Sequence, residues 1–187
     1  MKEKKQVPQE SLGVYGQDRD GNPTITYTRI LKHPVDKVWQ AITDPRHRAA
    51  WFPELTLEPR VGAQAVVDFS HGECPPSEDN PADVAVCTVT VFDPPHRLEY
   101  SGPDEHHRFE LTPAGDGCKL VFRSTLPGID VFDDETGTIH SRYSVACGWH
   151  DKLDMMGWSL DGSPFEEEGY AGPRKRRLYM AYLKQEK

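Results

Sequence analysis

The chain has 187 residues, which suits one domain with a sizeable core, and a formal net charge of -8 that is unevenly distributed. Residues 170–187 contain six Lys or Arg and one Glu, a local balance of +5, so residues 1–169 carry -13. An acidic body argues against nucleic acid and against an anionic membrane surface as partners, and without a run of about 18 apolar residues we expect no membrane span.

The first predicted elements follow a polar extension over residues 1–23. Residues 24–31 show the β-branched alternation of a strand, and residues 33–44 predict a helix with Pro34 in its first turn. A second short helix is expected directly after it, over residues 45–51.

The middle of the chain predicts an antiparallel sheet of about five or six strands. Strand patterns, most of them separated by short turns, occur over residues 63–70, 83–92, 96–101, 104–112 and 118–126. A Pro-rich loop over residues 71–82 is longer than a hairpin connection, so it leaves the number of strands open.

A long amphipathic helix is predicted after the strands, over residues 136–161. Its apolar stripe recurs at three- and four-residue steps and consists of Ile139, Ala146, Trp149, Leu153, Met156 and Leu160. The opposite side, which we expect to face solvent, carries His140, Ser144, Asp151 and Asp154. Because a one-sided helix of this length needs a large apolar surface, we expect it to lie against the sheet.

Four segments resemble the START-like superfamily, the helix-grip proteins, and within it the branch of the activator of the heat-shock protein 90 ATPase. They are HPVDKVWQAITDPRHRAAWFPE, VTVFDPPHRLEYS, FELTPAGDGCKLVFRSTL and ACGWHDKLDMMGWSLDG. The resemblance implies an α+β helix-grip fold, with a curved antiparallel sheet wrapped around the long C-terminal helix and two short helices after the first strand. We expect three parts of the chain: a polar N-terminal extension over 1–23, the START-like domain over 24–165 and a basic tail over 166–187 that lies outside the resemblance.

A curved sheet around one helix leaves room for a small-molecule cavity if the facing side chains do not fill it. The candidates for its lining come from the strands, the short second helix and the long helix: Trp51, Phe69, Tyr100, His107, Phe109, Arg142, Ala146, Trp149, His150 and Leu153. We expect the ligand of such a cavity to be a small apolar or amphipathic molecule.

Three of these candidates carry charge or titratable groups, and each leaves an alternative open. His107 shares a strand face with Phe109, so it either looks into the cavity or is a hydrogen-bonded interior histidine. Arg142 either meets an anionic ligand group or packs its stem at the sheet edge with its head in water. His150 lies at the edge of the stripe, where it bonds a ligand or the sheet backbone.

The sequence is compatible with three functions and contains no catalytic signature. The first is a non-catalytic domain that binds a small molecule. The second is a co-chaperone-like domain that contacts a protein through its outer sheet face. The third is a cyclase- or hydrolase-type enzyme in which His107, Arg142 or His150 acts. The basic tail is expected to be a solvated extension, unless it folds back on the acidic body or contacts another subunit of a homodimer.

The cysteine and histidine pattern predicts neither a metal site nor another cofactor. Cys74, Cys87, Cys118 and Cys147 are far apart and form no CxxC pair, and the chain begins without the apolar stretch of a signal peptide. We therefore expect reduced thiols and a cytoplasmic protein. His71 and Cys74 could begin a metal site, but no second closely spaced pair follows them.

Overall fold

This computed structural model describes residues 12–68, 84–103, 105–126, 130–133, 137–164 and 172–185. The helices are α1 (Val35–Thr43), α2 (Pro45–Arg48), α3 (Ser141–Asp161) and α4 (Pro173–Gln185). The strands are β1 (Val14–Gln17), β2 (Pro23–Leu31), β3 (Leu55–Leu57), β4 (Gln64–Asp68), β5 (Val84–Asp93), β6 (Arg97–Ser101), β7 (His106–Ala114), β8 (Gly117–Thr125), β9 (Asp130–Asp133) and β10 (Gly137–His140).

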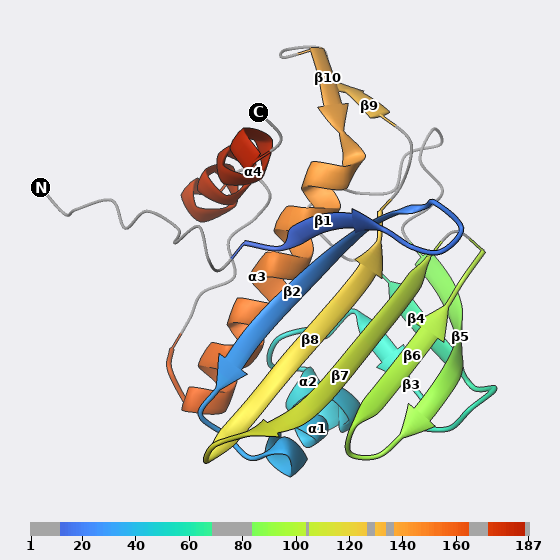
Figure 1. The fold of residues 1–187 in the computed structure, drawn as a ribbon, viewed down its shortest axis with the longest axis vertical. Coiled ribbons are helices and arrows are strands. Elements are labelled where there is room, and N and C mark those ends of the chain that lie inside the picture. The colour runs from blue at the N-terminus through green and yellow to red at the C-terminus, as the bar shows by residue number, and fades with distance from the viewer. Residues whose placement is uncertain are drawn as a thin grey trace, which may run out of the picture.

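One curved antiparallel sheet holds eight of these strands, in the order β1-β2-β8-β7-β6-β5-β4-β3, and α3 runs along its concave side (Figure 1). The short helices α1 and α2 lie at one end of the sheet, and the β9–β10 pair projects beyond the other. The predicted α+β helix-grip fold is confirmed.

The alternation of buried and exposed residues along a strand shows which face of the sheet is covered by the helix. Along β8, Leu120, Phe122 and Ser124 are buried, whereas Lys119 and Arg123, which alternate with them, are exposed. Successive side chains of a strand point to opposite faces, so these three residues belong to the inner face that α3 covers.

The long helix begins later than the sequence pattern predicts. Residues 137–140 pair with β9 as strand β10, and the helix starts at Ser141 rather than at residue 136. Thr138 and Ile139 are β-branched and favour the extended backbone that the pairing with β9 requires.

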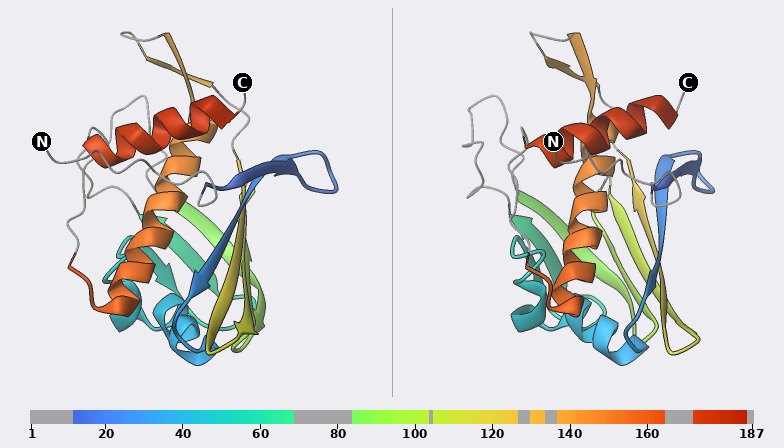
Figure 2. Two further views of the ribbon diagram at one scale, coloured as in Figure 1. Left: turned by 60° about the vertical axis from the view of Figure 1, so that its left-hand side comes forward. Right: turned by 90° about the vertical axis from the view of Figure 1, so that its left-hand side faces the viewer.

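The basic tail is not a solvated extension, which corrects the prediction made for it. From Pro173 it forms α4, which lies across α3 (Figure 2), with Leu178 and Tyr182 fully buried. Its Arg174 and Lys175 form ion pairs with Asp151 of α3. Asp151, expected on an exposed face, therefore retains only 5% exposure.

The N-terminal extension contacts the same region from residue 12 onward. Leu12 is buried, and β1 pairs with β2 at the edge of the sheet. A Cβ atom at Gly13 would lie 2.7 Å from side-chain atoms of Ile25 and Tyr27, so glycine permits this close approach. Among the described residues, no helix has both the length and the apolar character needed to cross a bilayer.

We expect Leu178→Ala to lower the free energy of unfolding by about 2–5 kcal/mol, because it leaves a cavity between α4 and the body of the fold. Met180→Ala is the matched control on the same helix: Met180 is 49% exposed, so its loss should change stability by less than about 0.5 kcal/mol. Urea denaturation of the two variants measures both values. Equal, small effects would show that α4 does not dock in solution.

Candidate functional site

Five rings pack together where α3 crosses the inner face of β6, β7 and β8. We call Tyr100, His107, Phe109, Phe122 and Trp149 the inner aromatic cluster. The ring centroids of Trp149 and Phe122 are 4.3 Å apart, those of Phe109 and Phe122 are 4.4 Å apart, and Tyr100 lies 4.8 Å from His107. The indole of Trp149 is also 5.1 Å from His107. These contacts fill the space between helix and sheet at this position.

Strand register places these residues beside one another. His107 of β7 is the cross-strand partner of Tyr100 in β6 and of Ser124 in β8. Phe109, two residues further along β7, faces Phe122 in the same way. Because directly opposed side chains lie within contact distance, the alternation of three strands produces one continuous inner surface.

A hydrogen-bonded chain of polar groups adjoins the rings. The Nε2 atom of His107 is 3.3 Å from a carboxylate oxygen of Glu105, and its Nδ1 atom is 3.1 Å from the hydroxyl of Ser124. The Ser124 Oγ also lies 2.9 Å from the carbonyl oxygen of Thr125, so this oxygen and Nδ1 of His107 are alternative acceptors for the single hydroxyl proton. Since a carboxylate only accepts, Nε2 carries a proton, and neutral His107 then accepts from Ser124 at Nδ1.

Burial and hydrogen bonding shift the pKa values of this chain. Burial lowers the pKa of His107, and the Glu105 carboxylate opposes that shift. The hydrogen bond from His107 lowers the pKa of Glu105, which therefore stays ionised at neutral pH. The site thus holds a neutral imidazole beside a carboxylate.

The hydroxyl of Tyr100 differs from these groups because it is buried and makes no hydrogen bond with the part of the chain that the structure describes. Burial raises its pKa well above the ordinary value, and the neighbouring Cys87 and Glu105 raise it further. The phenol therefore stays protonated and has a donor without an acceptor.

The nearby thiols are not nucleophiles at neutral pH. Burial raises the pKa of Cys87 to about 11 and that of Cys147 to about 12. Because the thiolate is the reactive form, both cysteines are unreactive in this environment.

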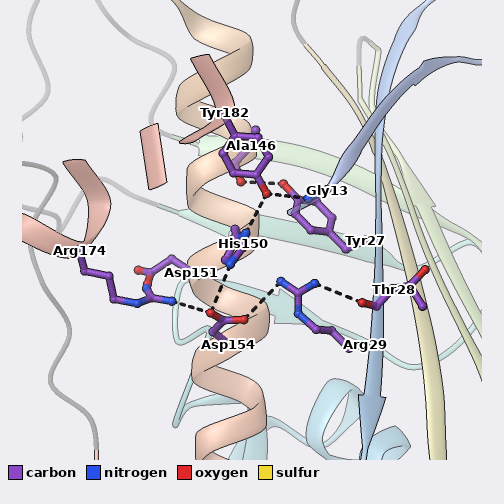
Figure 3. Close-up of polar contacts among 10 residues, drawn as sticks. All are labelled: Gly13, Tyr27, Thr28, Arg29, Ala146, His150, Asp151, Asp154, Arg174 and Tyr182. Atoms are coloured by element: carbon purple, nitrogen blue, oxygen red, sulfur yellow. Dashed lines mark hydrogen bonds and ion pairs between the residues drawn. The ribbon is translucent and has the colours of Figure 1, made fainter. Parts of the chain in front are cut away.

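A second polar group lies on the side of α3 that faces α4. We call His150, Asp154, Tyr182, Arg29 and Arg174 the α4 junction (Figure 3). The imidazole of His150 bonds the Tyr182 hydroxyl at 2.8 Å through Nδ1 and lies 3.3 Å from Asp154 through Nε2. Asp154 also pairs with Arg29 of β2 at 3.3 Å and with Arg174 of α4 at 2.7 Å.

The junction joins four parts of the chain. The Tyr182 hydroxyl accepts from the backbone nitrogen of Gly13 at 2.9 Å, and Tyr27 of β2 donates to the carbonyl oxygen of Ala146 at 2.6 Å. Burial lowers the pKa of His150 and raises that of Tyr182 to about 12. These neutral, mutually bonded groups fix α4 and the N-terminal segment to α3.

The structure brings four of the ten predicted lining residues into direct ring contact: Tyr100, His107, Phe109 and Trp149. Two others are buried in the same core. Trp51 donates to the carbonyl oxygen of Ala41 and contacts Phe52, whose ring meets Trp149, and Leu153 is buried on α3.

Three predicted lining residues lie elsewhere, and a fourth is not described. Ala146 and His150 face Tyr27, and both nitrogen atoms of His150 are engaged in the α4 junction. Arg142 lies 5.2 Å from the ring of Tyr143, the aromatic residue beside it at the start of α3. His107, Arg142 and His150 therefore do not converge on one point. Phe69 lies outside the described residues, as does the loop over 71–82.

Sequence reasoning missed Glu105, Ser124 and Tyr182. Ser124 could have been found, because it shares the alternation of Phe122 along its strand. Tyr182 follows Leu178 by one helical turn, but its partner His150 is 32 residues earlier. No local pattern connects that pair.

Two surface hollows are lined by described residues, and neither includes a residue of α3. One lies beside the β1–β2 turn and the outer face of β7 and β8, where Arg108 and Arg123 line it. The other lies between the end of α1 and β3. Within the described ranges, no group of three or more His, Cys, Asp or Glu is placed to hold a metal ion, and His71 and Cys74 are outside those ranges.

Stability should fall as the pH drops below about 6.5. The lowered pKa values of His107 and His150 mean that the unfolded chain binds protons more readily than the folded chain in this range. Each buried neutral histidine then lowers the free energy of unfolding by up to about 1.4 kcal/mol at pH 5.5 relative to pH 7.5.

Urea denaturation of the wild type and of His107→Gln at these two pH values tests this expectation. The variant should lose less stability on acidification than the wild type, because glutamine does not titrate. An identical loss in both proteins would show that the pKa of His107 is not lowered by folding.

Comparison with known proteins adds family information to this geometry. The sequence profile of the family described as polyketide cyclase / dehydrase and lipid transport matches residues 22–143. That family belongs to the START-like superfamily, so the predicted superfamily is confirmed, whereas the branch of the heat-shock ATPase activator stays a prediction. No curated protein matches the chain.

Solved structures with the same fold include two that the chain spans almost completely. A conserved protein of unknown function from Enterococcus faecalis is 15% identical, with 93% of this chain and 90% of that chain covered and a TM-score of 0.64. CalU16 from Micromonospora echinospora is 22% identical, with 90% and 89% covered and a TM-score of 0.59.

A third structure, DynU16, is described as a putative protein in the dynemicin biosynthetic locus. It is 25% identical over 75% of this chain, with a TM-score of 0.57, and the chain spans about half of its length, 48%.

Proposed function

Because the chain belongs to the polyketide cyclase/dehydrase and lipid transport family, we propose that it binds a small apolar or amphipathic molecule between α3 and the inner face of the sheet. The binding position is the inner aromatic cluster. The domain acts as a carrier or receptor for this molecule.

One observation carries the proposal: His107 and Ser124 are buried polar residues among the rings of Phe109, Phe122 and Trp149. A region that only stabilises the fold is more simply built from apolar side chains, since buried polar groups need partners. Aromatic walls with a few placed polar groups are typical of small-molecule sites.

Trp149 is the ring that a ligand would displace. It keeps 9% exposure, whereas Tyr100, Phe109 and Phe122 are fully buried. An incoming apolar molecule would take the place of the indole and stack on Phe122. The description of DynU16 as a protein of a biosynthetic locus also favours a small molecule over a macromolecule.

We expect the folded protein to bind the neutral fluorescent probe N-phenyl-1-naphthylamine saturably and with one-to-one stoichiometry. Trp149→Leu should bind it at least about threefold more tightly, because it vacates the space over Phe122. The same substitution should lower the free energy of unfolding by about 1–3 kcal/mol through the lost ring contacts.

Trp158→Leu is the matched control, a tryptophan of the same helix that contacts Arg174 of α4. The Kd of this control variant for the probe should equal that of the wild type. Fluorescence titration measures the three Kd values. Probe binding that appears only in partly denaturing urea would refute the proposed function.

A second candidate function is contact with a protein through the outer sheet face. Val84 and Val86 of β5 are 47% and 51% exposed, and Val66 of β4 lies opposite Val86. Val86→Glu would disrupt such a contact and leave probe binding unchanged. If it removes a stoichiometric co-purifying protein from the wild-type sample, the second function gains support over the first.

A further inference from the structure

Resting on the proposed function, we infer that the Tyr100 hydroxyl anchors the ligand by donating a hydrogen bond to an uncharged oxygen acceptor such as a ketone carbonyl. This group is a fully buried polar atom of the inner aromatic cluster that has no hydrogen-bond partner among the described residues. His107 bonds Glu105 and Ser124, so its polar atoms are occupied.

The hydroxyl is placed to act as a donor. The centroid of its ring lies 4.8 Å from that of His107 and 6.5 Å from that of Phe109, with an angle of 30° between the planes of Tyr100 and Phe109, so the neighbouring rings hold its orientation. The raised pKa of Tyr100 keeps its proton in place at every physiological pH. A buried donor without an acceptor destabilises the empty protein, and a ligand oxygen removes that cost on binding.

The surrounding charges select a neutral oxygen over an anionic one. Glu105 is ionised and close enough to Tyr100 to raise its pKa. The described cation that acts on Tyr100 is Arg48, which already donates to the carbonyl oxygens of Leu55, Ile42 and Thr43. A carboxylate beside Tyr100 would face Glu105, and no other cation among the described residues acts on Tyr100 to compensate, whereas a carbonyl group meets no such repulsion.

The test compares two probes of nearly equal shape, 2-acetylnaphthalene and 2-isopropenylnaphthalene, in which a methylene group replaces the carbonyl oxygen. The wild type should bind the ketone about two- to tenfold more tightly, the contribution of one neutral hydrogen bond. In Tyr100→Phe this preference should disappear, while the Kd for 2-isopropenylnaphthalene stays within about twofold of the wild type. Equilibrium dialysis measures all four constants.

Thermal stability gives a second, independent readout. Without ligand, Tyr100→Phe should raise the Tm by about 2–4 °C, because it removes an unpaired buried hydroxyl. Tyr27→Phe is the matched control: Tyr27 is equally buried but donates to Ala146, so this variant should lower the Tm and keep the preference for the ketone.

The outcomes separate this inference from the function on which it rests. If the wild type binds neither probe, the proposed function fails. If it binds both probes equally and Tyr100→Phe changes neither constant, the function stands and the anchor is wrong. A lower Tm for Tyr100→Phe would show that the hydroxyl has a structural partner, which also overturns the inference.

Infrared spectroscopy of the wild type covers the case in which Tyr100→Phe does not fold. The carbonyl stretch of bound 2-acetylnaphthalene should lie at lower wavenumber than in an apolar solvent, as hydrogen bonding requires. A stretch at the apolar-solvent position would refute the anchor without any variant.

Discussion

The rotation of α3 about its own axis is the constraint on which the rest of the structure depends. Trp149 and His150 are consecutive, so they point about 100° apart around the helix. His150 is held by Tyr182 and Asp154 on the side of α4, and this leaves Trp149 over Phe122 on the side of the sheet. The α4 junction and the inner aromatic cluster are therefore two consequences of one helix orientation. A change at the junction that turns α3 would also move the indole from the proposed binding position.

Charge complementarity decides where α4 docks. The acidic side of α3 presents Asp151 and Asp154, and Arg174 pairs with both of them. Burial lowers the pKa of Arg174 to about 10, so it remains charged at neutral pH. A buried ion pair contributes little net stability because desolvation offsets much of the attraction, but it disfavours every arrangement that leaves one charge unpaired. The apolar contacts of Leu178 and Tyr182 stabilise α4, while the ion pairs specify its position.

The sequence was informative wherever a single element's periodicity decided the outcome. Alternation along β7 correctly placed His107 and Phe109 on one face, and the helical stripe correctly placed Ala146, Trp149 and Leu153 in the interior. It failed where a partner distant in sequence decided the outcome. Asp151 looked solvent-exposed because its pattern carries no sign of Arg174, and the four residues of β10 looked helical because their partner strand β9 decides their conformation. The chemical site depends on cross-strand register between β6, β7 and β8, which no single segment encodes.

Two fully buried tyrosines on the same sheet face differ in what their hydroxyl groups do: one stabilises the fold, and the other is available to a ligand. Tyr27 donates to the carbonyl oxygen of Ala146 and also bonds Tyr182, so its hydroxyl serves the attachment of α3 and α4. Tyr100 is just as buried, but its hydroxyl bonds no described residue. Folding alone would favour phenylalanine at position 100, because an unpaired buried donor costs free energy and contributes nothing to packing that the ring does not. The unpaired hydroxyl lowers the stability of the fold, and it lies beside rings suited to an apolar molecule. Such a local loss of stability is what a binding site requires.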